Sequence, residues 1–432
     1  MLKKIKYSDK DYEKNINKHI DKSILNLSEK TSMVANILKD VKKNGNKALL
    51  KYIKEFENEE INNEEKLIVL QKEINGAADN CSKDFLNAVK LSIKRVSYYQ
   101  KKLLPKNFKY RDSIGMKLGC LWLPIQSCAL YVPGGKAFYP SSVVMNGVPA
   151  KLAGVKRIVI ITPSNNGKIR SEILATAKLL GIKEIYKIGG AQAIAAMTFG
   201  TKTINRVDKI VGPGNAFVAE AKKQVFGNVG IDSIAGPSEI MIVADKHSNA
   251  EWIAIDLLSQ AEHDEEASPI LVSDSEKLID DVNNYIEKFL RKISRADIAK
   301  SSMKKNGLSI LVKNINSSIE IINKLAPEHL EIMIKDKPNF VGKIKSAGAL
   351  FIGNYSPEAL GDYLAGPSHV LPTSGNARFE SGLSVLDFLK RTSYIEANKK
   401  SLSKVVKSVE VLAKSEGLDA HAKSAAIRFR KG

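Results

Sequence analysis

The feature that most constrains the fold is an alternation of short apolar runs with helical segments in the middle of the chain. Each run ends in glycine, proline or aspartate, and segments such as "IRSEILATAKLLG" and "AFVAEAKKQVFG" lie between them. Apolar runs that alternate with helices are typical of βαβ units, in which a helix connects two parallel strands. The runs are "CALYVPGG", "KRIVIITP", "EIYKIGG", "KIVGPGN" and "EIMIVAD".

The same alternation of apolar runs and helical segments continues after Asp245. We expect "PILVSD", "LSILVKN" and "GALFIGNY" to form further strands. Residues 1–125 are predicted to be mostly helical and charged, and the segment from about Lys390 is predicted to be a helical tail without strands. We therefore predict an α/β fold with two incomplete Rossmann-like parallel-sheet domains, a helical N-terminal arm and a helical C-terminal tail.

Composition narrows the class of protein. The chain has 432 residues, no apolar run approaches the roughly 18 residues of a membrane helix, and the N-terminus lacks the apolar core of a signal peptide. The three cysteines are too few for a disulfide framework or a thiolate zinc site. The net charge of +20 comes mostly from dispersed lysines, which favours a solvated basic surface over a nucleic-acid-binding patch. We expect a cytoplasmic protein with no nucleic-acid or membrane partner.

Two glycine-rich turns invite a phosphate-binding interpretation. They are "VPGGKAFYPSS" (Val132–Ser142) and "VGPGNAF" (Val211–Phe217). Neither matches the P-loop pattern, and Phe217 occupies the third glycine position of a dinucleotide fingerprint. The turns are therefore either ordinary strand-to-helix connections or a dinucleotide site without a tight pyrophosphate cradle, which would bind weakly.

A helix that ends in "DLLSQAEHDEE" supplies the first candidate site residues. Ser248 and Glu251 form an S-x-x-E pattern, which predicts a capped helix start near Asn249. Gln260 and His263 lie three residues apart and so share a face at the other end of that helix. The negative helix C-terminus favours a cation beside them, although such a pair is also common on ordinary surfaces.

Two further histidines have acidic neighbours. In "LAPEHLEI", Glu328 and His329 place a carboxylate beside an imidazole directly after Pro327, an arrangement that supports proton transfer. In "GDYLAGPSHVLPTSG", Asp362 and His369 fall in a stretch rich in glycine and proline, which we interpret as a loop. Each signal is modest by itself.

The last histidine, His421, follows "SEGLDA" near Glu416, where Gly417 is expected to end a helix. Taken together, these segments offer nitrogen and oxygen ligands without thiolates, a set that suits Zn²⁺ and other divalent ions. The absence of an H-E-x-x-H motif argues against a standard zinc protease.

At this point the sequence closely resembles one family. "YVPGGKAFYPSSVVMNGVPAKLAGV", "GPGNAFVAEAKKQVFG", "DLLSQAEHDEEA", "LAPEHLEI", "GDYLAGPSHVLPTSGNARFESGLSVLDFLKR" and "EGLDAHAKSAAIR" look like histidinol dehydrogenase. The resemblance runs from about Cys128 to the C-terminus. It implies oxidation of L-histidinol to L-histidine through L-histidinaldehyde, with two NAD⁺ per turnover and one Zn²⁺ per site, in a homodimer whose tail crosses to the partner subunit.

The resemblance also assigns roles to individual residues. Zinc would hold the imidazole and amine of the substrate, His329 would take the alcohol proton, and Glu328 would activate water for the aldehyde step. The implied zinc ligands are Gln260, His263, Asp362 and His421, the last from the partner subunit. The resemblance further implies that Ser238, His369 and Glu416 contact the substrate. The four zinc ligands and His329 are implied to contact it as well. The implied nucleotide contacts are Tyr131, Gln192 and Asn215.

The expected domains follow from these assignments. Residues 1–25 would form the N-terminal helical arm, and residues 26–130 with 239–383 a discontinuous zinc and substrate domain. Residues 131–238 would form the nucleotide-binding domain, and residues 384–432 a helical tail that is swapped in the dimer. The rival hypotheses are a zinc hydrolase, which would work without NAD⁺, a nucleic-acid-binding protein, and a catalytically inactive relative.

Overall fold

The computed structural model describes residues 1–23, 28–57, 61, 63–134 and 138–429. The larger of its two parallel sheets has six strands. All neighbouring strands in this sheet are parallel. The four central strands are buried at every residue, as expected for a parallel sheet covered on both faces. The order is β1 (Lys3–Lys6), β11 (Leu308–Leu311), β10 (Ser268–Ser273), β9 (Glu239–Ala244), β12 (His329–Met333) and β13 (Ala349–Ile352).

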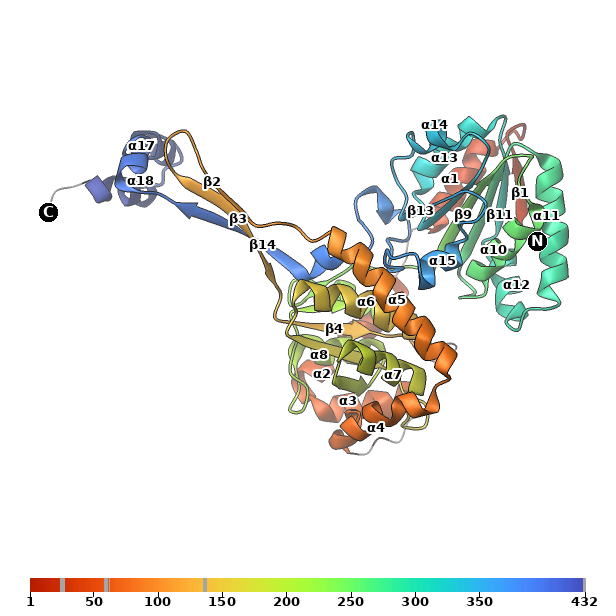
Figure 1. Cartoon of the computed structure of the whole chain (residues 1–432), viewed down its shortest axis with the longest axis horizontal. Coiled ribbons are helices and arrows are strands. Elements are labelled where there is room, and N and C mark those ends of the chain that lie inside the picture. The colour runs from red at the N-terminus through yellow and green to blue at the C-terminus, as the bar shows by residue number, and fades with distance from the viewer. Residues whose placement is uncertain (24–27, 58–60, 62, 135–137, 430–432) are drawn as a thin grey trace.

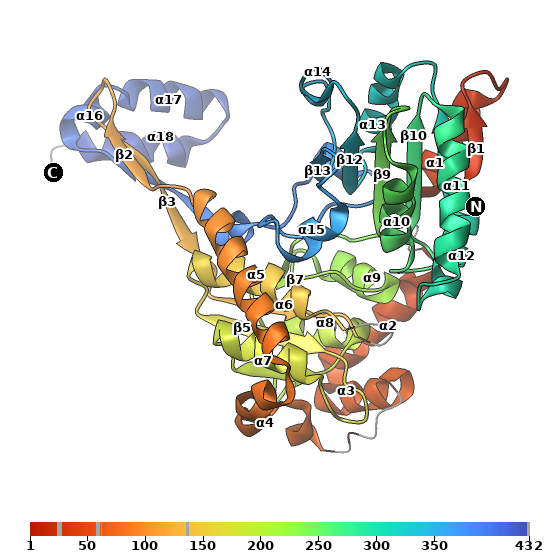
Figure 2. The same ribbon diagram turned by 45° about the vertical axis from the view of Figure 1, so that its right-hand side comes forward.

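Helices cover both faces of this sheet (Figures 1 and 2). Ile240 and Ile242 of β9 pack against the helices of one face, and Met241 and Val243 pack against those of the other. This alternation follows from the period of two along a strand. The first face carries α10 (Ala250–Ala261), α11 (Glu276–Leu290) and α12 (Ala296–Lys305), and the second carries α1 (Tyr12–Ser23), α13 (Ser318–Leu325) and α14 (Lys337–Val341).

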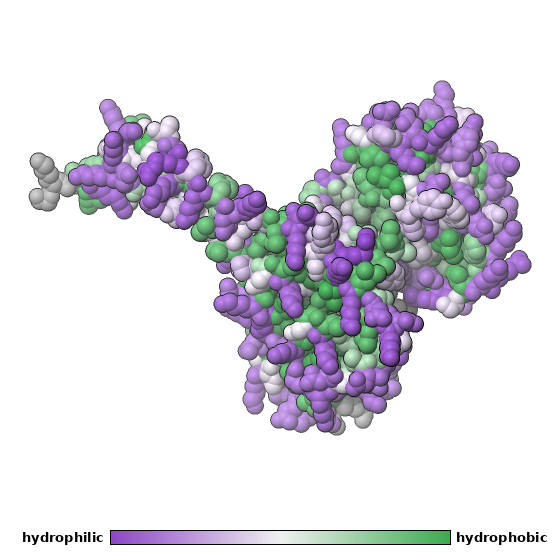
Figure 3. Space-filling view, in the orientation of Figure 1, coloured by the Kyte–Doolittle hydropathy of each residue, from purple (hydrophilic) through white to green (hydrophobic). Residues whose placement is uncertain are grey.

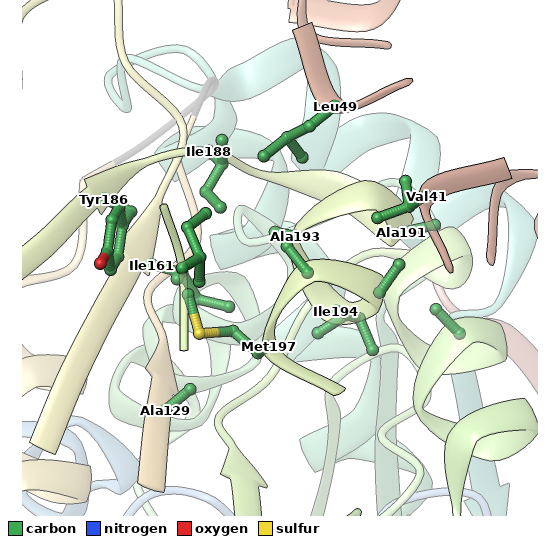
Figure 4. Packing of buried hydrophobic residues seen from close by; sticks show 14 of the residues in the cluster. Val41, Leu49, Ala129, Ile161, Tyr186, Ile188, Ala191, Ala193, Ile194 and Met197 are labelled. Carbon is green, nitrogen blue, oxygen red and sulfur yellow. The ribbon is translucent and has the colours of Figure 1, made fainter. Parts of the chain in front are cut away.

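The second parallel sheet has five strands. Ala129 and Ile161 pack against Ala193 and Met197 of one covering helix, as Figure 4 shows. The order is β6 (Glu184–Lys187), β5 (Arg157–Thr162), β4 (Ser127–Tyr131), β7 (Lys209–Val211) and β8 (Gly230–Ile231). One face carries α2 (Ser28–Asn44), α3 (Asn46–Tyr52), α8 (Gly190–Phe199) and α9 (Ala216–Val225), and the other α4 (Gln71–Gly76), α5 (Lys83–Lys102), α6 (Pro140–Ala153) and α7 (Ser171–Leu180).

An antiparallel ribbon extends from this body and carries the end of the chain (Figures 1 and 3). It consists of β2 (Phe108–Arg111), β3 (Lys117–Pro124) and β14 (Leu389–Glu396), in the order β14-β3-β2. The helices α16 (Lys399–Ser403), α17 (Val406–Ser415) and α18 (Asp419–Ala426) lie at its far end. Several apolar side chains are exposed there, including Leu412, Ile395 and Val411.

The predicted α/β fold with two parallel-sheet units and a helical tail is confirmed, with local differences. The expected helical arm at residues 1–25 contains strand β1, which pairs with β11 at the sheet edge. The tail is helical only from Lys399, because Leu389–Glu396 pairs with β3. β2 and β3 likewise lie within the region expected to be mostly helical. β2 and β14 are largely exposed, so their sequences lack the apolar runs that marked the buried strands. β3 does contain apolar residues, but it lies in an antiparallel ribbon and not in a βαβ unit.

The contacts of residues 26–130 also differ from the expected division. α2, α3, α4 and α5 pack on the five-stranded sheet, which lies mostly within residues 131–238, rather than on the six-stranded sheet. Their apolar side chains pack in the same two clusters as those of β4, β5 and the helices α6, α7, α8 and α9. Among the described residues, no helix has both the length and the apolar composition needed to cross a membrane.

The strand order reverses once in each sheet. In the five-stranded sheet the chain moves outward from β4 to β5 and β6, and then returns to the other side of β4 with β7. In the six-stranded sheet the reversal falls between β9 and β12. Ligands of open α/β sheets usually bind at such a reversal point, outside the carboxyl ends of the strands.

Candidate active site

One pocket lies at the reversal point of the five-stranded sheet and beside the amino ends of β9 and β12 in the six-stranded sheet. It has a volume of about 770 Å³, which is within the usual range for small-molecule sites. Segments that follow β4 and β7 line one side, including Pro133 and Gly214. The amino ends of β9, β10 and β12 line the other side, including Ser238, Ser268 and Glu328. The pocket therefore lies between the carboxyl ends of the five-stranded sheet and the amino ends of the six-stranded sheet.

The end of α10 brings Gln260 and His263 to this pocket. The Nε2 atom of Gln260 lies 3.2 Å from Nδ1 of His263. The Oε1 atom of Gln260 is buried and has no hydrogen-bond partner among the residues that the structure describes. A buried amide oxygen without a partner is costly unless a ligand satisfies it, so this atom points to a bound group.

The start of α10 differs in detail from the predicted capping box. The cap is Asn249, whose side-chain oxygen accepts hydrogen bonds from the backbone N–H groups of Glu251 and Trp252. Ser248 instead donates a hydrogen bond to the carbonyl oxygen of Met333. The helix nevertheless begins at Ala250, close to the predicted position, because asparagine is as good a cap as serine.

Glu328 and His329 lie together at the start of β12 and are 6% and 4% exposed. Both are held by the backbone of Glu239 on β9. The N–H group of Glu239 donates to Oε2 of Glu328 at 2.8 Å, and its carbonyl oxygen lies 2.8 Å from Nδ1 of His329. Gly348 allows the close approach behind them, because a Cβ there would lie 2.5 Å from the carbonyl oxygen of Glu328.

This backbone contact fixes the tautomer of His329. A carbonyl oxygen can only accept, so Nδ1 of His329 carries the hydrogen and Nε2 keeps its lone pair. Burial lowers the pKa of His329, which favours this neutral form, and burial raises the pKa of Glu328 well above its usual value. Nε2 lies 3.7 Å from Oε1 of Glu358, on the side away from Glu239.

Asp362 and His369 also meet in the pocket. Oδ1 of Asp362 lies 3.6 Å from Nδ1 of His369, and Nε2 of His369 lies 3.4 Å from the hydroxyl of Ser142 on α6. Burial lowers the pKa of His369, while Asp362 opposes that shift. Asp362 was expected in a loop, but it lies on the short helix α15 (Glu358–Tyr363). Six residues are too few to give a clear helical period in the sequence.

A group of metal-compatible donors is present beside these residues. Donor atoms of His329, Glu358 and Asp362 all lie within 4.8 Å of one another. Only Asp362 of this group belongs to the ligand set implied by the resemblance. With the amide oxygen of Gln260 and the imidazole of His263 in the same pocket, the donors are nitrogen and oxygen atoms, a set that fits Zn²⁺.

Glu358 is a pocket residue that the sequence reasoning missed. It follows Pro357 at a helix start, where glutamate is ordinarily a solvent-exposed partner of the helix dipole. Its side chain is instead buried. That burial arises from the packing of α15 against distant segments, and no local pattern reports it.

The three implied nucleotide contacts fall in two places. Asn215 lines the pocket and caps α9 by accepting from the N–H groups of Phe217 and Val218. The hydroxyl of Tyr131 accepts from the N–H group of Gly190, beyond the carboxyl end of β6. Burial raises the pKa of Tyr131 to about 12, so its hydroxyl keeps its proton at neutral pH.

Gln192 lies in the first turn of α8 and donates to Oε1 of Glu57 at 3.0 Å. Neither Gln192 nor Tyr131 belongs to the lining of the pocket just described. Both nevertheless lie near the carboxyl ends of the five-stranded sheet, as does Asn215. The three implied contacts thus share one edge of that sheet without sharing one cavity.

Within one chain, His421 and Glu416 lie far from the pocket. His421 lies on α18, which is at the tip of the ribbon (Figures 1 and 2). It lines a separate hollow there with Leu402 and Val409. Glu416 directly follows α17 in the same part of the chain. The other implied ligands and substrate contacts, including Ser238, do line the pocket. A contribution from a partner subunit stays a prediction.

These features define an α/β protein with two parallel sheets and a pocket suited to a metal ion and a small polar molecule. The sequence model described as histidinol dehydrogenase matches residues 21–429. Histidinol dehydrogenase 1 of Trichormus variabilis is 49% identical over 397 residues, which cover 92% of this chain and 91% of that protein. The histidinol dehydrogenase of Zymomonas mobilis is 43% identical over 431 residues, 100% of both chains.

A solved structure agrees with these relatives. The crystal structure of histidinol dehydrogenase from Elizabethkingia anophelis matches with a TM-score of 0.92 and 34% identity, and covers 99% of this chain and 98% of that one. The chain therefore belongs to the histidinol dehydrogenase family, as its motifs predicted.

Proposed function

We propose that this chain is a cytoplasmic, homodimeric, NAD-dependent zinc enzyme that oxidises L-histidinol to L-histidine through L-histidinaldehyde, in the last steps of histidine biosynthesis. The observation that supports this most is the convergence of Gln260, His263, Glu328, His329 and Asp362 on one pocket, in a chain of the histidinol dehydrogenase family. These residues come from three separate segments, and no local structural need explains their common location.

Gln260, His263 and Asp362 of one chain would hold the zinc ion, and His421 of the partner subunit would complete the set. The partnerless Oε1 atom of Gln260 supports this assignment, because a cation would satisfy it. Bound zinc would hold the imidazole and amine of the substrate and so orient the alcohol carbon. Ser238, His369 and Glu416 would contact the rest of the substrate.

His329 is the proposed base for the alcohol step. Its Nδ1 hydrogen stays with the carbonyl oxygen of Glu239, so Nε2 is the atom that accepts the alcohol proton. Its lowered pKa keeps Nε2 unprotonated at neutral pH. As the proton moved to Nε2, the carbon would lose a hydride to NAD⁺, which would give the aldehyde.

Glu328 is the proposed base for the aldehyde step. Its carboxyl group is held by the N–H group of Glu239, and Oε2 lies 3.6 Å from Nδ1 of His329. It would take a proton from the water that adds to the aldehyde. The hydrate would then lose a second hydride to a fresh NAD⁺ and a proton to give the carboxylic acid, so that the two steps would transfer four electrons in all.

The nucleotide would bind at the carboxyl ends of β4 and β7, near Tyr131, Gln192 and Asn215. The reversal of strand order there and the lining of the pocket by Gly214 and Asn215 support this position. The turn lacks the third glycine of the dinucleotide fingerprint. Loose binding is compatible with exchange of one reduced cofactor for a fresh one between the two steps.

A spectrophotometric assay tests the proposal. Purified protein should form NADH on addition of histidinol and NAD⁺, with two NADH per histidine formed. Removal of zinc with a chelator should abolish this activity, and restoring zinc should recover it. A zinc hydrolase would be active without NAD⁺, and absence of NADH formation from the zinc-loaded dimer would overturn the proposed reaction.

A further inference from the structure

Glu358 is a buried acid in the pocket to which no role has been assigned. It is 1% exposed and is the first residue of α15. Its own N–H group donates to Oε1 of Glu331 at 2.6 Å. Glu331 lies two residues beyond His329 on β12, so both side chains are on the same side of the strand. The start of α15 is thereby attached to the strand that carries the proposed base.

The carboxyl group of Glu358 contacts three elements of the site. Oε1 lies 3.7 Å from Nε2 of His329 on β12, and the hydroxyl of Ser259 donates to Oε2 at 3.4 Å. Ser259 directly precedes Gln260 on α10. The carboxyl groups of Glu358 and Asp362 lie one turn apart on α15, and an oxygen of each lies within 4.8 Å of the other. One buried group thus touches the segment of every proposed metal ligand in this chain and the proposed base.

We propose that Glu358 is a positioning residue, whose carboxyl group holds Asp362 and His329 at the separation that metal binding and proton transfer require. This inference rests on the proposed function, because it takes Asp362 as a metal ligand and His329 as a base. Glu358 acts through both residues and is not itself a ligand or a base.

The burial of Glu358 supports a positioning role. An acidic side chain removed from water costs free energy unless its surroundings satisfy it, and a leucine or methionine would fill the same volume without that cost. Among the described residues, Oε1 has no conventional hydrogen-bond partner, and it faces His329. Partners behind the ligands of metal sites orient those ligands, and their removal typically lowers metal affinity about 10- to 100-fold.

Direct ligation is the rival interpretation, because donor atoms of His329, Glu358 and Asp362 lie within 4.8 Å of one another. The two roles differ in their response to Glu358→Gln. An amide keeps the shape and can still hydrogen-bond with Asp362 and Ser259, so a positioning role tolerates it. A ligand role does not, because an amide oxygen is a weaker, uncharged donor.

The experiment measures the zinc affinity of the full-length dimer by competition with a chromogenic chelator. We expect Glu358→Ala to bind zinc about 10- to 100-fold more weakly and Glu358→Gln to remain within about 3-fold of the unmodified protein. Glu220→Ala is the matched control, since Glu220 is also 1% exposed but lies on α9, outside the site. Its zinc affinity should not change.

A second readout separates positioning from general destabilisation. Glu358→Ala should also shift the pH profile of the alcohol step, because His329 loses a neighbour of Nε2, whereas Glu220→Ala should not. If Glu358→Ala does not fold, Ser259→Ala removes the contact at Oε2, together with a hydrogen bond to the carbonyl oxygen of Asp256 within α10, and should weaken zinc binding a few-fold.

Three other outcomes would contradict the positioning role of Glu358. Equal losses in Glu358→Ala and Glu358→Gln would assign Glu358 as a ligand. Unchanged affinity in Glu358→Ala, with zinc bound by the unmodified protein, would remove the positioning role and leave the proposed function standing. Failure of the unmodified dimer to bind zinc would overturn the proposed metal site and this inference together.

Discussion

The two sides of the pocket are built from different chemistry. The side from the five-stranded sheet presents mainly small residues and backbone, such as Pro213, Gly214 and Ala216. The side from the six-stranded sheet presents titratable groups, among them Glu239, Glu328 and His329. Backbone and small residues let an extended ligand approach closely, whereas titratable side chains move protons and hold ions. The first side is suited to binding and the second to chemistry.

The difference follows from which edge of each sheet meets the pocket. The five-stranded sheet uses its carboxyl ends, where ligands usually bind in such folds. The six-stranded sheet uses its amino ends. A crossover helix runs antiparallel to its strands, so the C-terminus of α10 reaches this edge and delivers Gln260 and His263. The negative end of the helix dipole favours a cation at that point.

The largest expected effect tests whether the six-stranded side is incomplete within one chain. His263→Asn and His421→Asn should each be inactive, because each removes one proposed zinc ligand. When the two variants are mixed and exchange subunits, about a quarter of the sites should regain all four ligands and the mixture should recover activity accordingly. Each variant incubated alone is the control. Absence of recovery after proven subunit exchange would contradict a shared site.

Replacement of the proposed base should affect chemistry and leave cofactor binding unchanged. His329→Asn is expected to lower kcat about 10²- to 10⁴-fold, because it removes the proton acceptor. The KM for NAD⁺ should remain within about 2-fold, since His329 belongs to the other side of the pocket. His247→Asn is the control, because His247 is exposed in the turn after β9. A rise in the KM for NAD⁺ that matches the fall in kcat would remove the division between the two sides.

Glu328→Gln should separate the two oxidation steps. The oxidation of histidinaldehyde is expected to fall about 10²-fold or more, because water loses its base, and the oxidation of histidinol should fall less. Rates measured separately from histidinol and from histidinaldehyde check this. Equal losses in both half-reactions would contradict the assigned role.

The pH dependence of the alcohol step follows from the burial of His329. The base must be unprotonated, so the rate falls as pH drops through the pKa of the folded protein. Burial lowers that pKa below the ordinary value of 6.5, so the acid limb should lie below pH 6.5. A pH profile of single-turnover histidinol oxidation measures the limb. A limb above pH 6.5 would indicate that another group controls the step.

The sequence predicted the parts of the fold whose signal is local. Buried strands such as Glu239–Ala244 are continuous apolar runs, and the residues around them were expected in the correct elements. Leu389–Glu396 was missed because its residues are mostly exposed and charged, and only its pairing with β3 makes it a strand. Lys3–Lys6 was missed for the same reason, since four residues at a sheet edge carry little pattern.

The candidate site was predicted where chemistry is concentrated in short motifs. Glu328 and His329 are adjacent in sequence and also meet in the pocket. The tautomer of His329 could not be predicted, because it depends on the carbonyl oxygen of Glu239, 90 residues away. Glu358 could not be predicted either, since its burial results from the contact of three distant segments.

The smallest expected effect tests the binding side of the pocket. Asn215→Ala removes the cap of α9, where the side-chain oxygen accepts from two N–H groups at 3.0 and 3.1 Å. The unfolding free energy should fall by about 1 kcal/mol. The KM for NAD⁺ should rise several-fold, because Asn215 also lines the pocket, and kcat should change by less than about 2-fold.

Asn249→Ala provides a closely matched control. Asn249 caps α10 with the same geometry, since its side-chain oxygen accepts from two N–H groups at 2.9 and 3.2 Å, but it lies at the end of the helix away from the pocket. It should cost a similar free energy of unfolding, measured by denaturant titration, and leave the KM for NAD⁺ unchanged. If both variants raised this KM equally, the effect at Asn215 would come from lost stability. The proposal that the five-stranded side of the pocket binds the nucleotide would then lose its main support.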